Sequence, residues 1–272
     1  MFAVQLDLHH TDQAAYLEEL FWTLDAVDSV TYHLHDAMTV IGSDPNLEQP
    51  ILKLLQAEGL ADSVTVKTAK EIPKEDWAES WKQYWHVSRV LPDLIIQPSW
   101  ETYHPQSQQE IVLKLDPGSA FGTGTHDTTR LVLALMQEFL PVQSVLDVGC
   151  GSGILAIYAA KHGVPHVVAV DNDPLAVEVA RVNASENGVD IQFLSETTGQ
   201  FDLLTANILT HVLIEMMPQL VERTSANGIL IFSGITQEQY AQMADCLKNY
   251  PVKIVRVVLK GDWIALVCRK NT

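Results

Sequence analysis

S-V-L-D-V-G-C-G-S-G-I-L-A-I-Y-A-A, residues 144–160, is the stretch that decides the fold. An apolar strand runs into Gly149, Gly151 and Gly153, and a helix begins directly after them. Glycines allow a tight turn and a close approach of the backbone to a ligand, and the start of a helix offers free N–H groups. The spacing is G-x-G-x-G, not the G-x-G-x-x-G of dinucleotide-binding turns. The segment therefore predicts a ligand site at a strand–turn–helix junction.

Two carboxylates accompany this turn and narrow the choice of ligand. Asp147 precedes Gly149 by two residues, and a carboxylate there would repel a pyrophosphate but suit a ligand with an amino group. The run V-V-A-V-D-N-D-P, residues 167–174, puts Asp171 at the end of the next strand. A carboxylate at that strand end can accept hydrogen bonds from both hydroxyls of a ribose. Together the two residues favour an adenosyl amino acid over a dinucleotide.

From about residue 125 the chain alternates strand and helix patterns, which predicts a mostly parallel sheet covered on both faces. The strand candidates are 144–148, 166–171, 190–194, 201–206, 228–233, 252–259 and 263–268. Only Lys260 to Asp262 separate the last two runs, so we expect them to form an antiparallel hairpin. The predicted fold class is α/β, with a Rossmann-like sheet of seven strands. This layout resembles the class I methyltransferases.

A second motif, L-D-P-G-S-A-F-G-T-G-T-H-D-T-T-R at residues 115–130, precedes this core. Its glycines and hydroxyls predict a loop that can close over a ligand. Thr125 or Asp127 is expected to cap the following helix, with Thr129 in its first turn near the glycine turn. His126 could act as a base, although a surface or capping histidine is the commoner case.

A third motif, F-D-L-L-T-A-N-I-L-T at residues 201–210, places Asn207 at the end of the fourth strand of the sheet. A buried asparagine without a partner is costly, so Asn207 is expected either to bind substrate or to fix the loop that follows. We favour the role in binding.

The first third of the chain has a different organisation. Residues 1–68 predict strands and helices in the order βαββαβ, a ferredoxin-like domain. Residues 69–86 predict a linker helix, with Trp77, Trp81 and Trp85 forming one stripe. Residues 87–272 then form the predicted catalytic domain, which opens with short strands at 87–91, 93–97 and 109–115.

Charge and composition exclude several classes of protein. The 272 residues carry 34 acidic and 17 basic side chains, a net charge of -17, which argues against binding to a phosphate backbone. Residues 1–60 hold ten acidic residues and a single basic one, Lys53, which favours either a solvated surface or a docking face for a basic protein. The three cysteines have no metal-binding or disulfide spacing, so no metal site is expected. No signal peptide or membrane span is expected, and a soluble cytoplasmic protein is the default.

The motifs, taken in order, resemble one family of enzymes. D-P-G-S-A-F-G-T-G-T-H-D-T-T, D-V-G-C-G-S-G-I-L-A-I, V-D-N-D-P and A-N-I-L are similar to the bacterial methyltransferases of ribosomal protein L-eleven (L11). D-W-A-E-S-W-K-Q-Y-W and I-I-Q-P-S-W are similar to the linker and inter-domain segments of that family. Residues 21–31 lack the glycines usual in the first domain of the family, and the acidic excess of this domain is heavy.

The resemblance implies a function and a set of site residues. The family transfers methyl groups from S-adenosylmethionine to lysine side chains and the terminal α-amine of L11, which its first domain holds. Position by position, the implied cofactor contacts are Thr129, Gly149, Asp171 and Asn207, with Phe121 and Gly122 in a covering loop. Asp147 and Gly151 complete the candidate cofactor site, and Asn207 is the candidate catalytic residue. Trp263 matches a tryptophan near the mouth of the active site.

Other functions stay open from the sequence. The same fold could methylate another basic protein or a small amine. Methylation of adenine in nucleic acid is disfavoured, because the chain is acidic and Ile208 and Leu209 follow Asn207 where a Pro-Pro-aromatic run would stand. A non-catalytic module that binds the cofactor and a ribosomal partner is the third hypothesis.

Overall fold

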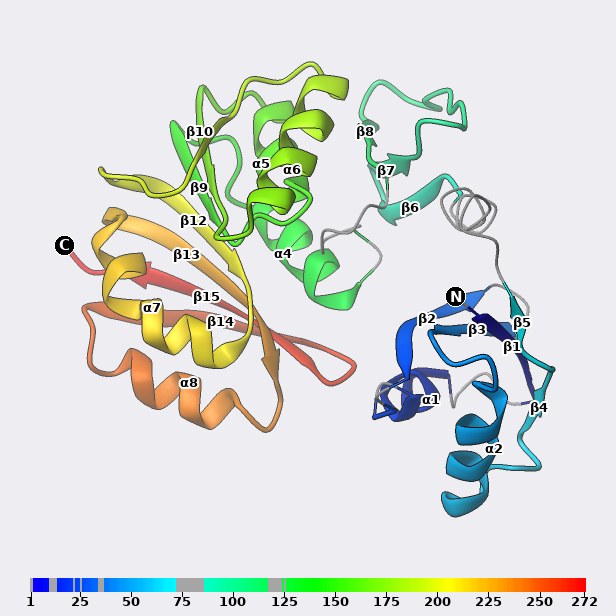
Figure 1. Ribbon diagram of the computed structural model, residues 1–272. Helices are drawn as coiled ribbons and strands as arrows, with labels where there is room; N and C mark the ends of the chain where they lie inside the picture. Colours follow the sequence, from blue (N-terminus) through cyan, green and yellow to red (C-terminus); the bar gives the residue numbers. More distant parts are fainter. Residues whose placement is uncertain are drawn as a thin grey trace. The chain divides into compact units, whose positions relative to one another are not determined.

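A computed structural model describes residues 2–9, 14–21, 23–24, 26–33, 37–71, 86–116, 124 and 126–272 (Figure 1). The chain divides into two compact units, Met1–Trp85 and His86–Thr272. The predictions made at Thr125, Phe121, Gly122, Trp77, Trp81 and Trp85 lie outside the described residues. Every helix in the described part of the chain is too short or too polar to cross a bilayer.

The larger unit is built on a sheet of seven strands, which confirms the predicted fold class. The strands are β9 (Ser144–Val148), β10 (His166–Val170), β11 (Gln192–Leu194), β12 (Phe201–Asn207), β13 (Thr224–Thr236), β14 (Val252–Lys260) and β15 (Trp263–Lys270). They lie in the order β11-β10-β9-β12-β13-β15-β14. Neighbours pair in parallel from β11 to β13, whereas β15 runs antiparallel to both β13 and β14. The predicted hairpin of the last two strands is therefore confirmed.

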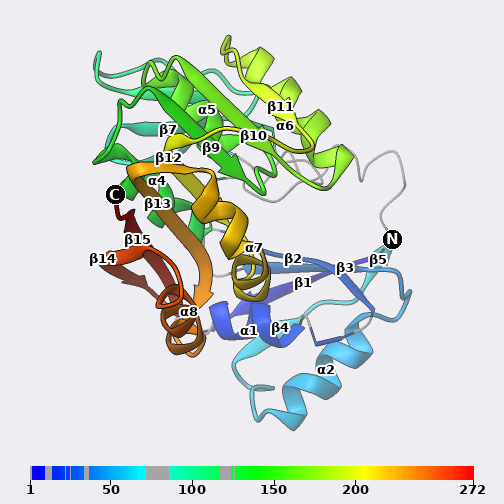
Figure 2. The same ribbon diagram turned by 90° about the vertical axis from the view of Figure 1, so that its left-hand side faces the viewer.

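Helices cover both faces of this sheet, as its apolar strands require. One face carries α4 (Asp127–Gln137), α5 (Ile154–Lys161) and α6 (Pro174–Glu186), and the other carries α7 (Thr210–Glu222) and α8 (Tyr240–Leu247) (Figures 1 and 2). Residues Ile154–Ala159 of α5 are all buried, so this helix has almost no polar face. A fully embedded α5 fixes the position of the glycine turn that precedes it.

The larger unit begins with a separate sheet of three short strands. It consists of β6 (Ser88–Leu91), β7 (Leu94–Gln97) and β8 (Ile111–Lys114). Asn187, at the end of α6, joins this sheet to the core, because its side-chain amide accepts from the backbone N–H of Lys114 and donates to the Lys114 carbonyl at 2.9 and 2.7 Å. The end of β8 is thereby held beside α6.

The smaller unit has its own core. Its elements are β1 (Phe2–Leu8), α1 (Ala14–Phe21), β2 (Val27–His33), β3 (Ala37–Gly42), α2 (Glu48–Ala57), β4 (Val64–Val66) and β5 (Lys70–Glu71). The order βαββαβ and the antiparallel path β2-β3-β1-β4 are those of a ferredoxin-like sheet. The hydrophobic core contains residues of both helices, among them Leu17, Phe21, Ile51 and Leu55.

The start of the expected linker helix is a strand. Lys70 and Glu71 form β5, which pairs with Ala3 and Phe2 of β1. Because β4 pairs only with Leu6–Leu8, β5 satisfies backbone groups of β1 that β4 does not reach. Residues 72–85, the rest of that prediction, lie outside the described residues.

Candidate active site

The glycine turn joins β9 to α5 in a conformation that other residues rarely adopt. Gly149, Gly151 and Gly153 have φ values of +70°, +52° and +79°. A Cβ on Gly149 would lie 2.3 Å from Cγ2 of Ile208, so the site leaves no room for a side chain there. The turn is tied to the neighbouring strand, because the N–H groups of Gly149 and Cys150 donate to the Val170 carbonyl at 2.9 and 3.1 Å. The turn is therefore pre-formed at the carboxyl edge of the sheet.

Asp171 lies directly after β10 and is bonded to the same turn. Its Oδ2 accepts from the backbone N–H of Gly151 at 2.9 Å, and its Oδ1 accepts from that of Asp173 at 3.0 Å. A carboxylate offers about four acceptor positions, so two remain after these bonds. The side chain is only half-buried and can therefore accept further hydrogen bonds from a ligand.

Asp147 lies beneath the turn and not on its surface. The residue is completely buried in β9, and its Oδ1 accepts from the Thr205 hydroxyl of β12 at 2.8 Å. Burial, more than the nearby Asp171 charge, raises the pKa of this carboxyl to about 7, although interactions with the Thr205 hydroxyl and the Ala156 backbone N–H act in the opposite direction. Its Oδ2 is buried and has no hydrogen-bond partner among the described residues. The structure thus separates Asp147 from the half-buried rim that Asp171 occupies.

Asn207 and Thr129 meet at the same edge of the sheet. The side-chain N–H of Asn207, at the end of β12, donates to the Thr129 hydroxyl in the first turn of α4 at 3.3 Å. Thr129 is buried, whereas Asn207 is half-buried. The two residues are 78 positions apart in the chain, and the fold brings both beside the glycine turn, since Ile208 contacts Gly149.

The cap of α4 differs from the expectation. Among the described residues, the N-cap is His126 and not Asp127, because the His126 Nδ1 accepts from the backbone N–H of Thr128 at 3.2 Å. An Nδ1 that accepts this bond carries the lone pair, so the ring proton lies on Nε2. Burial lowers the pKa of His126, against the opposing effect of Asp127. The Nδ1 of His126 is therefore engaged in capping α4.

Contacts of the β14–β15 hairpin fix its turn against the start of α4. The ring of Trp263 meets that of His126 edge to face, with centroids 5.2 Å apart. Lys260 pairs with Asp127 at 2.8 Å, and the Gln237 side chain donates to the Gly261 carbonyl at 3.0 Å. Trp263 is thus held beside the first turn of the helix that carries Thr129.

These residues fit an adenosyl amino acid. The turn has no room for a Cβ at Gly149, Asp171 keeps acceptor capacity for ribose hydroxyls, and the first N–H groups of α5 face the same edge of the sheet. Phe121 and Gly122, expected in the covering loop, lie outside the described residues. Within the described residues, no group of three His, Cys, Asp or Glu side chains could hold a metal ion.

Sequence reasoning did not single out Thr205 or Ile208. Thr205 bonds Asp147 because the two residues are in register on adjacent strands, and Ile208 packs against Gly149. Thr205 stands two residues before Asn207, as Asp147 stands two before Gly149. This equal spacing predicts that Thr205 lies beside Asp147 only if β12 is already known to be the neighbour of β9.

Comparison with known proteins places the chain in one family. The family model described as "Ribosomal protein L11 methyltransferase (PrmA)" matches residues 5–271. A protein from Heliobacterium modesticaldum named ribosomal protein L11 methyltransferase is 35% identical over 94% of this chain and 86% of its own length. A protein of the same name from Pelobacter propionicus is 38% identical over 91% of this chain and 84% of its own length.

Solved structures agree with this result. The crystal structure of a ribosomal protein L11 methylase from Lactobacillus delbrueckii subsp. bulgaricus matches with a TM-score of 0.65 and 36% identity, over 69% of this chain and 100% of that one. A methyltransferase from Pyrococcus furiosus matches at a TM-score of 0.50 and 17% identity over 59% of this chain and 90% of its own, which shows the shared fold alone. The chain belongs to the ribosomal protein L11 methyltransferase family.

Proposed function

We propose that this protein transfers methyl groups from S-adenosylmethionine to amino groups of ribosomal protein L11, at lysine side chains and at the terminal α-amine. The observation that carries the proposal is the meeting of three strand ends, where the glycine turn, Asp171 and the Asn207–Thr129 pair lie together. Family membership supports the substrate, because the relatives at 35% and 38% identity are named for it.

The chain's own residues would hold the cofactor in a defined orientation. Asp171 would accept from the ribose hydroxyls, and the N–H groups of the turn and of α5 would face the amino-acid carboxylate. Asp147 would act from beneath, by holding β9 and β12 together through Thr205. When bound, S-adenosylmethionine supplies a sulfonium methyl group that is already electrophilic, so alignment is the main requirement.

The substrate amine must be uncharged when it reacts. For a lysine of pKa about 10.4 at pH 7, deprotonation costs roughly 4.6 kcal/mol, whereas for an α-amine near 7.8 it costs about 1 kcal/mol. Desolvation in an apolar site lowers the pKa of the lysine and removes part of that cost. Asn207 would orient the amine, and the proton would leave to solvent. In this proposal His126 would cap α4 and would not act as the base, because its Nδ1 accepts from the backbone N–H of Thr128.

The partner is a protein and not a nucleic acid. The net charge of -17 opposes a phosphate backbone and favours a basic partner. We propose that the acidic first unit recognises L11, either free or on the large subunit.

A transfer assay tests this function. The full-length protein is incubated with radioactive S-adenosylmethionine and purified L11, and the modified residues are found by mass spectrometry. We expect label in lysines and in the α-amine of L11. Binding of the cofactor without transfer would contradict the proposal, and so would transfer to other basic proteins or small amines while L11 stays unlabelled.

A further inference from the structure

One face of α6 connects the glycine turn to the end of β8. Ala180, Asn183 and Asn187 are spaced by three and four residues, so they lie along one face of the helix and its end. A Cβ on Gly153 would lie 3.0 Å from the Cβ of Ala180, so the turn packs directly on this face. At the other end, Asn187 bonds both backbone groups of Lys114. The face therefore contacts the turn and the three-stranded sheet.

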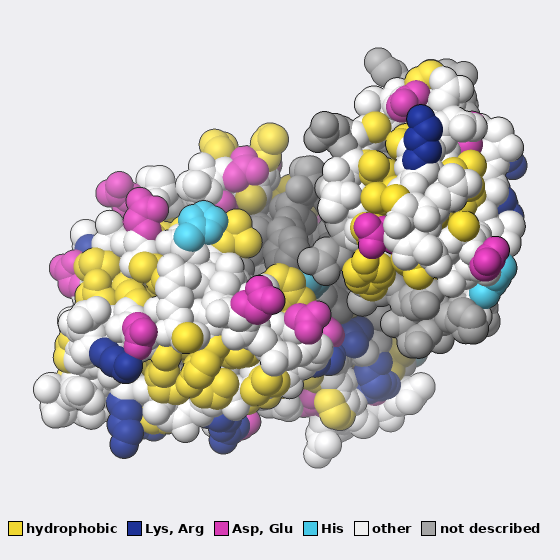
Figure 3. Space-filling model, turned by 90° about the horizontal axis from the view of Figure 1, so that it is seen from below, with side chains coloured by type: hydrophobic (Ala, Val, Ile, Leu, Met, Phe, Trp, Pro, Cys, Tyr) yellow, Lys and Arg dark blue, Asp and Glu magenta, His cyan; other side chains and the backbone are white. Residues whose placement is uncertain are grey.

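The two asparagines on this face are buried polar residues. Lys, Arg, Asp and Glu side chains stand at the surface that Figure 3 shows, whereas Asn183 and Asn187 are only 5% and 6% exposed. The other buried residues of α6 are alanines, namely Ala176, Ala180 and Ala184. Alanine is also the better helix former, so the helix alone does not require an amide at position 183. The hydrogen bonds of the two amides explain their presence there.

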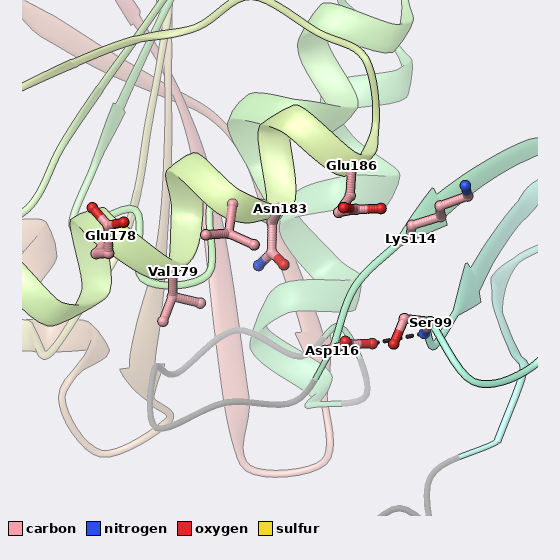
Figure 4. A pocket seen from close by; sticks show the side chains of 8 residues that line it. Ser99, Lys114, Asp116, Glu178, Val179, Asn183 and Glu186 are labelled. Carbon is pink, nitrogen blue, oxygen red and sulfur yellow. Dashed lines mark hydrogen bonds between the residues drawn. The ribbon is translucent and has the colours of Figure 1, made fainter.

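These hydrogen bonds join the glycine turn to β8 in one chain. The Asn183 side-chain N–H group donates at 2.9 Å to the carbonyl of Ser152, which lies within the turn. The Asn187 side-chain N–H group donates at 2.7 Å to the backbone carbonyl of Asn183. The bonds of Asn187 to Lys114 complete the chain. Figure 4 shows Asn183 on α6 and Lys114 at the end of β8.

The Asn183 bond holds a part of the turn that the bonds from β10 do not hold. The carboxyl end of β10 accepts from the N–H groups of three turn residues, Gly149, Cys150 and Gly151. Asn183 instead fixes the Ser152 carbonyl from the side of α6. Because a peptide unit is planar, a fixed carbonyl fixes the whole Ser152–Gly153 unit, directly before α5 begins. The turn is thus held from two elements.

We propose that Asn183 and Asn187 are positioning residues for S-adenosylmethionine. Asn183 holds the glycine turn in the shape that receives the cofactor, and Asn187 couples the turn to the end of β8. Lys114 stands directly before the motif of residues 115–130, so the chain of bonds joins two segments that the sequence assigns to the cofactor site. The inference rests on the cofactor placement of the proposed function. Since Asn207 and Thr129 stand on other elements, these amides should act on cofactor affinity and not on turnover.

Calorimetry with S-adenosylhomocysteine and steady-state kinetics test the role of Asn183. Asn183→Ala suits the helix but leaves the Ser152 carbonyl without its donor. We expect the Kd of S-adenosylhomocysteine and the KM of S-adenosylmethionine to rise about three- to tenfold, the scale of one hydrogen bond, and kcat to stay within about twofold.

The matched control for Asn183→Ala is Thr224→Val. It also removes a buried hydrogen bond to a backbone carbonyl, that of Leu220, and should leave the Kd unchanged. An unchanged Kd in Asn183→Ala, or an equal rise in Thr224→Val, would overturn the inference.

Amide hydrogen exchange on the full-length protein tests the coupling to β8. Asn187→Ala removes the acceptor of the Lys114 N–H group, so this amide should exchange about tenfold faster or more. The Kd should rise less than in Asn183→Ala, because the bond to Ser152 stays.

Gln137→Ala is the control for Asn187→Ala. The Gln137 side chain donates to Asp93 at 2.6 Å and so also ties the three-stranded sheet to the core, but from the end of α4 opposite to Thr129. It should leave the Kd unchanged. An equal rise in Kd in Gln137→Ala and Asn187→Ala would mean that any loosening of the sheet weakens binding, and would overturn the coupling.

The inference and the proposed function fail separately. A protein that methylates L11, and whose Kd is the same with Asn183→Ala, would refute the inference alone. A protein whose Kd rises in Asn183→Ala, but which transfers no methyl group to L11, would refute the proposed function alone.

Discussion

Two neighbouring layers of residues at the carboxyl end of the sheet have different roles. Asp147 and Thr205 form the buried layer, where one carboxyl meets one hydroxyl out of reach of solvent. Gly149, Asp171 and Asn207 form the rim, where backbone N–H groups and half-buried side chains keep unused hydrogen-bonding capacity. The difference teaches that a residue close to the glycine turn in sequence need not be exposed at the surface of that turn. Changes in the rim should alter methyl transfer, and changes in the buried layer should alter stability.

The largest effect on methyl transfer is expected at Gly149. Gly149→Ala forces a side chain into a φ of +70° and toward Ile208, which displaces the turn. We expect kcat/KM to fall about a hundredfold or more, the scale of a displaced reactive geometry. The matched control is Gly163→Ala, at a φ of +81° with nothing within 4 Å, which should lose about 1–2 kcal/mol of stability and retain activity. Equal activity losses in both variants would contradict the role of the turn.

Asn207→Ala should have the next largest effect. Removal of the amide takes away the group that orients the amine and bonds Thr129. We expect kcat to fall about ten- to a hundredfold while cofactor affinity changes little, measured by steady-state kinetics and calorimetry. A normal kcat with weakened cofactor binding would refute this role.

Asp171→Asn should act on affinity more than on turnover. The amide keeps the shape of the side chain but loses the charge that strengthens its hydrogen bonds. We expect the Kd of S-adenosylmethionine to rise about tenfold, since a hydrogen bond to a charged group contributes about 1.5–3 kcal/mol. Asp173→Asn, a change at the N-cap of α6, is the control and should leave the Kd unchanged. A Kd that stays constant in Asp171→Asn would place the ribose elsewhere.

The sequence predicts the rim better than the layer beneath it. The strand, the three glycines and Asp171 are local features, and the meeting of Asn207 with the turn follows from strand order in a known type of sheet. The Asp147–Thr205 bond depends on the register of β9 against β12, which no local pattern specifies. The sequence does not predict His126 as the N-cap of α4 either, because Thr and Asp, the types at positions 125 and 127, are more usual N-cap residues.

In the smaller unit, the sequence did not predict β5, because this strand also depends on pairing with a distant part of the chain. Lys70 and Glu71 have no strand pattern of their own and are placed by backbone groups of β1, more than 60 residues earlier in the chain. Pairing between distant segments decides this element, and propensity does not.

Thr205→Val should leave methyl transfer within about twofold and lower stability. It leaves Asp147 Oδ1 without its donor, at a cost of about 1–3 kcal/mol in the free energy of unfolding. The matched control is Thr224→Val, which removes a buried hydrogen bond to the neutral Leu220 carbonyl. At pH 8, where Asp147 is mostly charged, Thr224→Val should lower the free energy of unfolding less than Thr205→Val does. Urea unfolding measures both, and a large loss of kcat in Thr205→Val would mean that the buried layer takes part in the reaction.

Asp147 should also give stability a pH dependence. Its pKa is raised to about 7 in the folded protein, above the value of about 3.9 expected in the unfolded chain. The folded state thus holds a proton that the unfolded state has released, so stability from this group is full below pH 4 and falls as pH rises through 7. Asp147→Asn should remove this slope, which is at most about 1.4 kcal/mol per pH unit. If urea unfolding of Asp147→Asn between pH 4 and 7 gives the same slope of unfolding free energy against pH as the unchanged protein, another group is responsible for the titration.

A crystal structure of the protein with S-adenosylhomocysteine tests the central claim most directly. We predict the ribose at Asp171, the amino-acid carboxylate at the N–H groups of the glycine turn, and the sulfur beside Asn207. A nucleoside bound anywhere else, or no binding at millimolar concentration, would contradict the account.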